Sequence, residues 1–218
     1  MPSLADLTRA WLLRQLGLTS SNLTEADLQM ALFSQQGSGG GGGGLASNVT
    51  YASGRYYGPS EDVSAGVVTT VIDRCWAVPF EVGTTESFDR IASEVTVVGS
   101  GGNVLRMGIY GSTNGLPDAL IVDAGTSDAS ILGAFEKNIN IQLFPGLYWL
   151  AMASQLGVPA EVRALGAMGS KYVGHTANPL GVNYKSYRTT AGVGGALPAN
   201  FGVPVADSSA PKIFMRAV

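Results

Sequence analysis

Residues 138–143 read NINIQL, a strict alternation of polar and apolar side chains. Successive side chains of a β-strand point to opposite faces, so this run predicts a strand with its isoleucines and leucine in a core. The turn signal Pro145-Gly146 follows, and residues 147–154 (LYWLAMAS) then predict a returning strand. Alternation of this kind requires one buried and one wetted face, which is typical of antiparallel sheets.

Further short β-branched or alternating runs lie on both sides of this pair. They cover residues 67–72, 75–82, 91–98, 105–110, 119–124 and 212–218. Residues 99–103 (GSGGN) predict a hairpin, and residues 114–118 (NGLPD) carry turn chemistry. About eight strands with no helical window between them predict an antiparallel β-sandwich over residues 59–218.

Residues 1–36 have a different pattern and predict a small α-helical hairpin. Two capping boxes, Ser3 to Asp6 and Thr24 to Asp27, each precede an apolar helical stripe. A segment this short, without disulfides or metal ligands, does not usually fold alone, so we expect these helices to anchor on a partner surface. Packing on the chain's own C-terminal domain is the alternative. The anchoring residues are predicted to be Leu4, Leu7, Trp11, Leu12, Leu16, Leu28, Leu32 and Phe33.

A glycine-rich stretch, QGSGGGGGGLA, separates these two parts of the chain. Residues 39–44 are six consecutive glycines, and we expect residues 37–58 to form a flexible linker. Eight such residues span about 15 Å on average. No Gly-Lys-Ser/Thr follows and no strand precedes, so the stretch is not a phosphate-binding loop. An engineered fusion linker is the alternative origin.

Composition limits the classes of function. Of the 218 residues 45% are hydrophobic and only 13% charged, and the net charge is −3. The charge disfavours nucleic-acid binding, and the low charged fraction favours a surface buried between subunits, with a homotrimer as the expected state. The N-terminus has no secretion-signal pattern and no window has about 18 apolar residues, so we expect a protein made in the cytoplasm and not inserted in a membrane.

Enzymatic and metal chemistry are poorly supported. Cys75 is the one cysteine and His175 the one histidine, so disulfides and histidine–cysteine metal sites are excluded by count. Cys75 lies in an apolar run and is expected in the core. No G-x-S-x-G motif accompanies His175. Asp118, Asp123 and Asp128 are expected to be turn and edge residues rather than calcium ligands. We therefore expect a protein that is not an enzyme and has no cofactor.

A long polar stretch, residues 174–195, is the candidate ligand contact. Exposed tyrosine and asparagine suit carbohydrate or protein recognition, because the ring stacks while the polar groups form hydrogen bonds. An ordinary long connection is the alternative. The candidate residues are His175, Asn178, Asn183, Tyr184, Tyr187 and Arg188.

Residues 105–154 resemble jelly-roll modules of tail-tip, tail-fibre and head-fibre proteins of tailed bacteriophages. The resemblance rests on the runs LRMGIYGSTNGLPDALIVDAGT and NINIQLFPGLYWLAMASQ, about a quarter of the chain. The helix pair in residues 1–36 also looks like an attachment segment of phage virion proteins. The resemblance implies a jelly-roll fold and a virion context, and it does not separate head from tail.

The leading hypothesis is a structural virion component, anchored to other virion proteins by residues 1–36. Its sandwich would project outward, decorating the particle or binding a host-surface glycan. A carbohydrate-binding module tethered to a partner protein is the second hypothesis, and the absence of a secretion pattern counts against it. A polysaccharide hydrolase is the third, which would need a facing pair of carboxylates that no spacing in the sequence nominates.

Overall fold

The computed structural model describes residues 50–59, 65–166, 172–173 and 183–218. The chain divides into two compact units, Met1–Ala46 and Ser47–Val218. The helical anchor predicted for residues 1–36, from Leu4 to Phe33, and the glycine run 39–44 lie outside the described residues. The fold presented here is that of the second unit.

The described residues form twelve strands and no helix. In chain order the strands are β1 (Tyr56–Tyr57), β2 (Ala65–Thr69), β3 (Cys75–Val82), β4 (Glu86–Val97), β5 (Val104–Thr113), β6 (Leu116–Asp128), β7 (Gly133–Leu143), β8 (Gly146–Gln155), β9 (Glu161–Leu165), β10 (Ser186–Thr189), β11 (Pro204–Asp207) and β12 (Phe214–Ala217).

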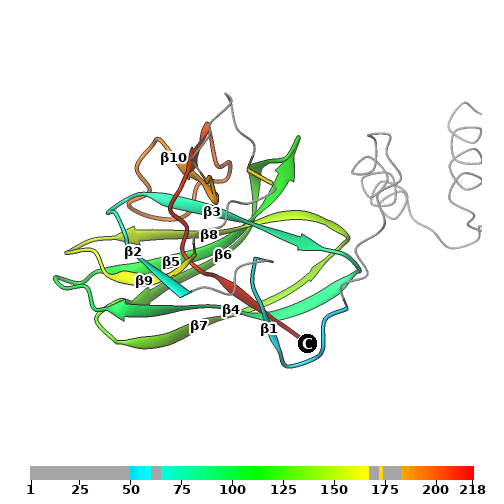
Figure 1. The fold of residues 1–218 in the computed structure, drawn as a ribbon, viewed down its shortest axis with the longest axis horizontal. Helices are drawn as coiled ribbons and strands as arrows, with labels where there is room; N and C mark the ends of the chain where they lie inside the picture. Colours follow the sequence, from blue (N-terminus) through cyan, green and yellow to red (C-terminus); the bar gives the residue numbers. More distant parts are fainter. Residues whose placement is uncertain (1–49, 60–64, 167–171, 174–182) are drawn as a thin grey trace, which may run out of the picture. The chain divides into compact units, whose positions relative to one another are not determined.

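The strands make two antiparallel six-stranded sheets, which we name sheet A and sheet B (Figure 1). Sheet B has the order β11-β10-β3-β8-β5-β6. In sheet A, β7 runs along one edge of β4, while β12 and β9 pair with successive parts of its other edge. Strand β1 pairs with the outer edge of β12, and β2 pairs with the outer edge of β9. This two-sheet arrangement confirms the predicted antiparallel β-sandwich.

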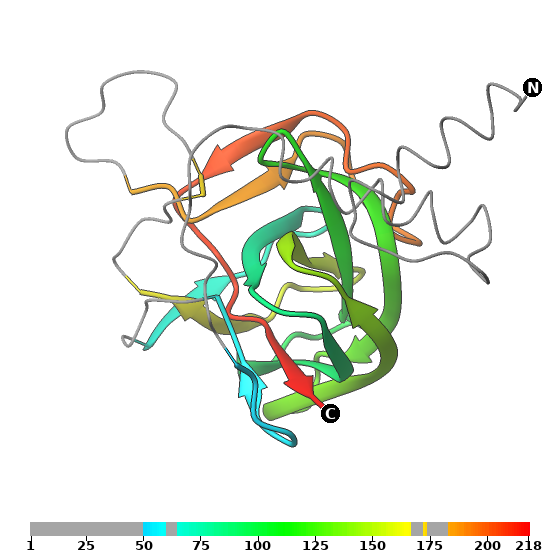
Figure 2. The ribbon, with the colours of Figure 1, turned by 90° about the vertical axis from the view of Figure 1, so that its right-hand side faces the viewer.

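The main core lies between the two sheets, whose strands enclose it in the view along them (Figure 2). The alternation of residues 138–143 behaves as predicted, since Ile139 and Leu143 are buried and Asn138, Asn140 and Gln142 are exposed. The largest fully buried members of the core are Phe80, Phe88, Ile91, Leu105, Met107, Ile109, Leu150, Met152 and Ile213.

A second apolar cluster covers the outer face of sheet B. The C-terminal segment, including residues 193–201, folds over that face and packs on Trp149, Tyr110 and Cys75. Cys75 is fully buried there, as predicted. Strand β8 is consequently buried on both faces, with Leu150 and Met152 in the main core and Trp149 and Ala151 in the second cluster.

Polar side chains on sheet B hold this covering segment in place. Gln155 Nε2 donates to the carbonyls of Val193 at 2.7 Å and Gly195 at 2.6 Å. The Asp123 carboxylate accepts from the Leu197 amide at 3.1 Å. The covering segment is therefore tied to the sheet by directional hydrogen bonds as well as by apolar contact.

Two connections differ from the sequence prediction. The glycine-rich residues 99–103 join β4 to β5, and Phe144 and Pro145 join β7 to β8, which begins at Gly146. Each pair of strands belongs to different sheets. Neither connection is the tight hairpin that was expected, because the chain crosses the sandwich at both places. The turn at 114–118 is confirmed: Asn114 and Gly115 have φ values of 53° and 76° and join the paired strands β5 and β6.

The predicted linker is shorter than expected at its C-terminal end. Residues 51–57, assigned from sequence to the linker 37–58, belong to the sandwich, since β1 pairs with β12 and Tyr51 contacts the core. The Tyr51 ring makes edge contacts with Tyr57 and Phe88, at centroid distances of 4.6 Å and 5.6 Å. The sequence prediction failed here because two-residue strands have no readable periodicity.

Candidate functional site

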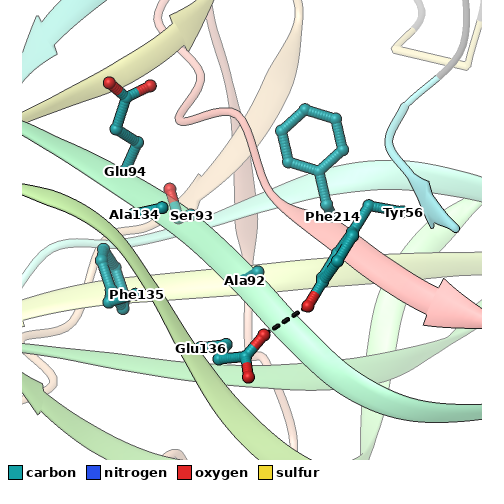
Figure 3. Close-up of a pocket in the computed structure, with 8 residues that line it drawn as sticks. All are labelled: Tyr56, Ala92, Ser93, Glu94, Ala134, Phe135, Glu136 and Phe214. Carbon is teal, nitrogen blue, oxygen red and sulfur yellow. Dashed lines mark hydrogen bonds between the residues drawn. The ribbon is translucent and has the colours of Figure 1, made fainter. Parts of the chain in front are cut away.

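A groove of about 410 Å³ lies on the outer face of sheet A. Four neighbouring strands supply its lining, with β1 and β12 on one side and β4 and β7 on the other (Figure 3). Its volume is within the usual range of small-molecule sites. The lining residues are Tyr56, Ala92, Ser93, Glu94, Ala134, Phe135, Glu136 and Phe214.

Strand register explains the shape of the groove. Ala92 on β4 lies between Phe214 on β12 and Glu136 on β7, which pair with it from opposite sides. Directly paired side chains on one face lie about 5 Å apart. The small side chain of Ala92 therefore leaves a depression, the floor of the groove, between the longer side chains of Phe214 and Glu136. Ala134, the partner of Glu94, extends that floor along the next pair.

Tyr56 crosses this floor from the β1 side. The next residue, Tyr57, packs against the core, so the Tyr56 ring points outward and is 42% exposed. The Tyr56 hydroxyl donates a hydrogen bond to Glu136 Oε2 on β7, as the dashed line in Figure 3 shows. The phenol ring therefore extends over the groove from one side to the other.

The two glutamates of the groove are held as carboxylates. The hydrogen bond from Tyr56 lowers the pKa of Glu136, and Arg90, whose Nε lies 3.3 Å from Oε1, adds to that shift. The pKa of Glu94 is lowered by its hydrogen bonds from Arg163, two contacts of 2.8 Å. Both side chains are therefore negatively charged acceptors in fixed positions at neutral pH.

The described residues contain no metal-ligating cluster of three or more histidine, cysteine or acidic side chains. The three aspartates first considered as calcium ligands bond to the chain itself. Asp118 accepts from Thr113 Oγ1 at 2.7 Å, Asp123 makes a bidentate pair with Arg106, and Asp128 accepts from the Ser130 amide at 2.8 Å. Their predicted role as turn and edge residues agrees with these bonds.

The candidate ligand residues predicted in the stretch 174–195 are not brought together in one exposed site. His175 and Asn178 lie outside the described residues. Tyr187 is only 9% exposed, because β10 pairs with β3 and places its ring against Trp149 at a centroid distance of 5.3 Å. For Tyr187 the prediction of surface ligand contact is corrected: its ring is a packing residue.

The remaining predicted ligand residues have varied surroundings. Asn183 is exposed, whereas Tyr184 is half-buried against the second apolar cluster. Arg188 pairs with Asp207 of β11, with its Nε at 3.1 Å from Oδ2. The groove residues, in contrast, were not singled out from the sequence. Tyr56 and Phe214 lie at opposite ends of the sandwich sequence, and only the insertion of β12 between β1 and β4 brings them together.

Comparison with known proteins gives no family assignment. No protein-family model matches the chain, and no curated protein matches it. One solved structure with a similar fold is a clostridial cysteine protease, Cwp84, after propeptide cleavage, with 12% identity and a TM-score of 0.42. That match covers 75% of this chain and 40% of the protease chain.

A second similar structure contains the cysteine protease and lectin-like domains of Cwp84, a surface-layer-associated protein of Clostridium difficile. It has 12% identity and a TM-score of 0.39, with coverage of 72% of this chain and 37% of the other. The present chain thus spans about two fifths of the length of these structures. At this level of similarity, no property of either structure is transferred to this chain.

Proposed function

We propose that this protein is a non-enzymatic binding protein whose sandwich recognises a carbohydrate in the groove on sheet A. The observation that supports it is the combination of Tyr56 and Phe214 beside a floor of alanines, with ionised carboxylates at the sides. Sugars have apolar C–H faces that pack on aromatic rings, and hydroxyl groups that donate to fixed acceptors. A glycan of a host-cell surface is the ligand class that this chemistry suits.

The two groove carboxylates favour binding over glycoside hydrolysis. A hydrolase of the common kind needs one carboxyl group with a raised pKa, so that it can donate a proton to the leaving oxygen. Here the pKa of Glu94 is lowered by hydrogen bonds from Arg163. The pKa of Glu136 is lowered by hydrogen bonds from Tyr56 and Arg90. Neither side chain is poised to act as a general acid, which supports the non-enzymatic alternative.

Tyr56→Ala and Phe214→Ala are expected to weaken glycan binding by the full-length protein roughly fivefold to thirtyfold. The reason is the loss of one aromatic wall, since a stacked ring contributes roughly 1–2 kcal/mol of binding free energy. Tyr56→Phe keeps the ring and loses only the bond to Glu136, so we expect a smaller loss of roughly twofold to fivefold. A glycan array first identifies the ligand, and isothermal titration calorimetry then compares the variants.

Phe144→Ala is the matched control, because Phe144 is an exposed aromatic side chain outside the groove. We expect it to bind like the wild type. If the full-length protein bound no glycan on a broad array, or if Phe144→Ala lost as much affinity as Tyr56→Ala, the groove would not be a carbohydrate site.

We also propose that the setting of this module is a bacteriophage virion, in which residues 1–36 attach the chain to other virion proteins. The support is the resemblance of residues 105–154 to phage jelly-roll modules and the helix-pair pattern before a glycine-rich segment. A homotrimer is part of this proposal, because the low charged fraction leaves apolar surface to bury between copies.

Immunogold labelling of a C-terminal tag is expected to mark one defined place on purified particles, either the head or the tail tip. Deletion of residues 1–36 is expected to abolish the label while the remaining chain is still produced, because the predicted attachment surface is gone. Absence of the intact protein from purified particles would contradict the virion proposal. The proposal that the groove binds a carbohydrate would be unaffected.

A further inference from the structure

Three connections meet at the end of the sandwich away from β1 and the C-terminus. They are residues 97–103, 128–133 and 155–160, which lie at the left in Figure 1. The Gly99 amide donates to the Ala129 carbonyl, and Ser100 and Val158 exchange both backbone hydrogen bonds. The three connections are therefore neighbours that form one surface.

Each of these connections carries two aliphatic side chains that are 46–66% exposed. Turns normally present polar residues to solvent, so three adjoining turns with exposed aliphatics are unusual. The six residues, which we call the aliphatic tip, are Val97, Val98, Ile131, Leu132, Leu156 and Val158.

One of these side chains, Leu156, is exposed although its backbone conformation is unfavourable. Leu156 has a φ of 62°, and Gly157 after it has a φ of 58°. The left-handed region is unfavourable for a side chain such as leucine, and asparagine or glycine is usual in such a turn. A strained leucine that is also 60% exposed gains little from its own fold, which indicates that its side chain serves a contact outside the chain.

Several polar groups of the tip have hydrogen-bond partners within the fold. Asn103 is 1% exposed and its Nδ2 donates to Ser154 Oγ and to the carbonyls of Gln155 and Leu156. Its Oδ1 accepts from the Ala160 amide at 3.2 Å. The carbonyls of Gln155 and Leu156 and the Ala160 amide therefore keep a hydrogen-bond partner when water is removed from this surface.

The charge and composition of the aliphatic tip favour contact with a lipid surface over contact with a protein. The three connections contain one ionisable side chain, Asp128, and no Trp, Tyr, Phe, Met or Arg, the residues that dominate protein–protein interfaces. Leucine, isoleucine and valine are favourable in hydrocarbon. The backbone of the neighbouring connection 70–74 bonds to β8 beside the tip, through the Asp73 amide and the Ser154 carbonyl.

We propose that the aliphatic tip inserts shallowly into the interface of a lipid bilayer. Nothing in this contact spans a membrane, and the described residues contain no helix long and apolar enough to do so. The tip lies about 33 Å along β4 from Ser87, where Val218 pairs at the other end. The contact is therefore at the end of the sandwich opposite the C-terminus, and it uses none of the residues that line the groove.

The double variant Ile131→Ser with Leu132→Ser is expected to lower the partition of the full-length protein onto phosphatidylcholine vesicles roughly tenfold or more. These two side chains are the most exposed of the tip, so the substitutions cause little change in folding stability. Vesicle flotation measures the partition, and circular dichroism checks the fold. Because no basic residue of the three connections takes part, we expect the same result in low and high salt.

The matched control is Val203→Ser with Val218→Ser, since these side chains are 75% and 65% exposed but lie elsewhere. Its partition is expected to equal that of the wild type. The proposal is overturned if the wild type does not float with the vesicles, or if the tip variant floats equally well, which would place the lipid contact outside the tip. It is also overturned if the tip variant changes only self-association in sedimentation velocity without lipid.

Discussion

Asn103→Ala is expected to lower the free energy of unfolding by about 4 kcal/mol. The side chain is buried and makes four hydrogen bonds to the connection 154–160. Alanine leaves these donors and acceptors without partners in a place that water reaches poorly, and each such group costs about 1–3 kcal/mol. Urea denaturation of the full-length protein, followed by tryptophan fluorescence, measures the change.

Asn200→Ala is the control for this prediction. Its side chain donates to Asp118 Oδ1, but at an exposed position, so we expect a change below about 0.5 kcal/mol. A loss of less than about 1 kcal/mol for Asn103→Ala would show that water replaces its hydrogen bonds and that the three connections are held by other contacts.

Gly157→Ala is the second large effect, with an expected loss of about 3 kcal/mol or more. The added Cβ would lie 2.0 Å from the Ser100 carbonyl oxygen and 2.7 Å from that of Gly101, so the two connections must move apart. The left-handed backbone, with a φ of 58°, adds a cost of its own.

Gly115→Ala separates these two causes. Gly115 also has a positive φ, of 76°, but an added Cβ meets nothing within 4 Å. We expect a loss of about 1 kcal/mol there, which reports the backbone cost alone. Equal melting temperatures for the two variants would contradict the close contact between residues 100 and 157. Differential scanning calorimetry is suited to this comparison.

The strands of the sandwich could be predicted where one face of the strand is exposed to solvent and the other is buried. Residues 138–143 illustrate this, since their alternation is read directly from sequence. Strands β3 and β8 were also recognised, although both are buried on two faces, because each is a continuous apolar run between turn signals. Strands β1, β9, β10 and β11 were missed, as two to five residues give too short a window for a period to be measured.

Connectivity was harder to predict than the strands themselves. A glycine-rich connection such as 99–103 allows the chain to reverse within a sheet or to cross to the opposite sheet. The difference is decided by packing: Ile91 of β4 and Leu105 of β5 are both buried in the main core, but their strands belong to different sheets. Local turn chemistry does not contain that information.

The candidate site was beyond the reach of sequence patterns. Tyr56 precedes the sandwich's regular strands and Phe214 lies in its last one, so no motif joins them. The stretch 174–195 looked more functional because it is long, polar and rich in tyrosine. Tyr187 shows why that signal misled: a tyrosine ring also closes an apolar surface, here over Trp149, while its neighbour Arg188 faces Asp207.

The position of β12 has a consequence for how the chain acquires its structure during synthesis. Strand β12 lies between β1 and β4, so sheet A remains open until residues 214–217 have emerged from the ribosome. Until then β1 has no strand to pair with, and Tyr56 and Phe214 do not meet. Contacts between such distant parts of a chain form slowly, so the edge of β4 that β12 covers is an unpaired, aggregation-prone edge until β12 is inserted.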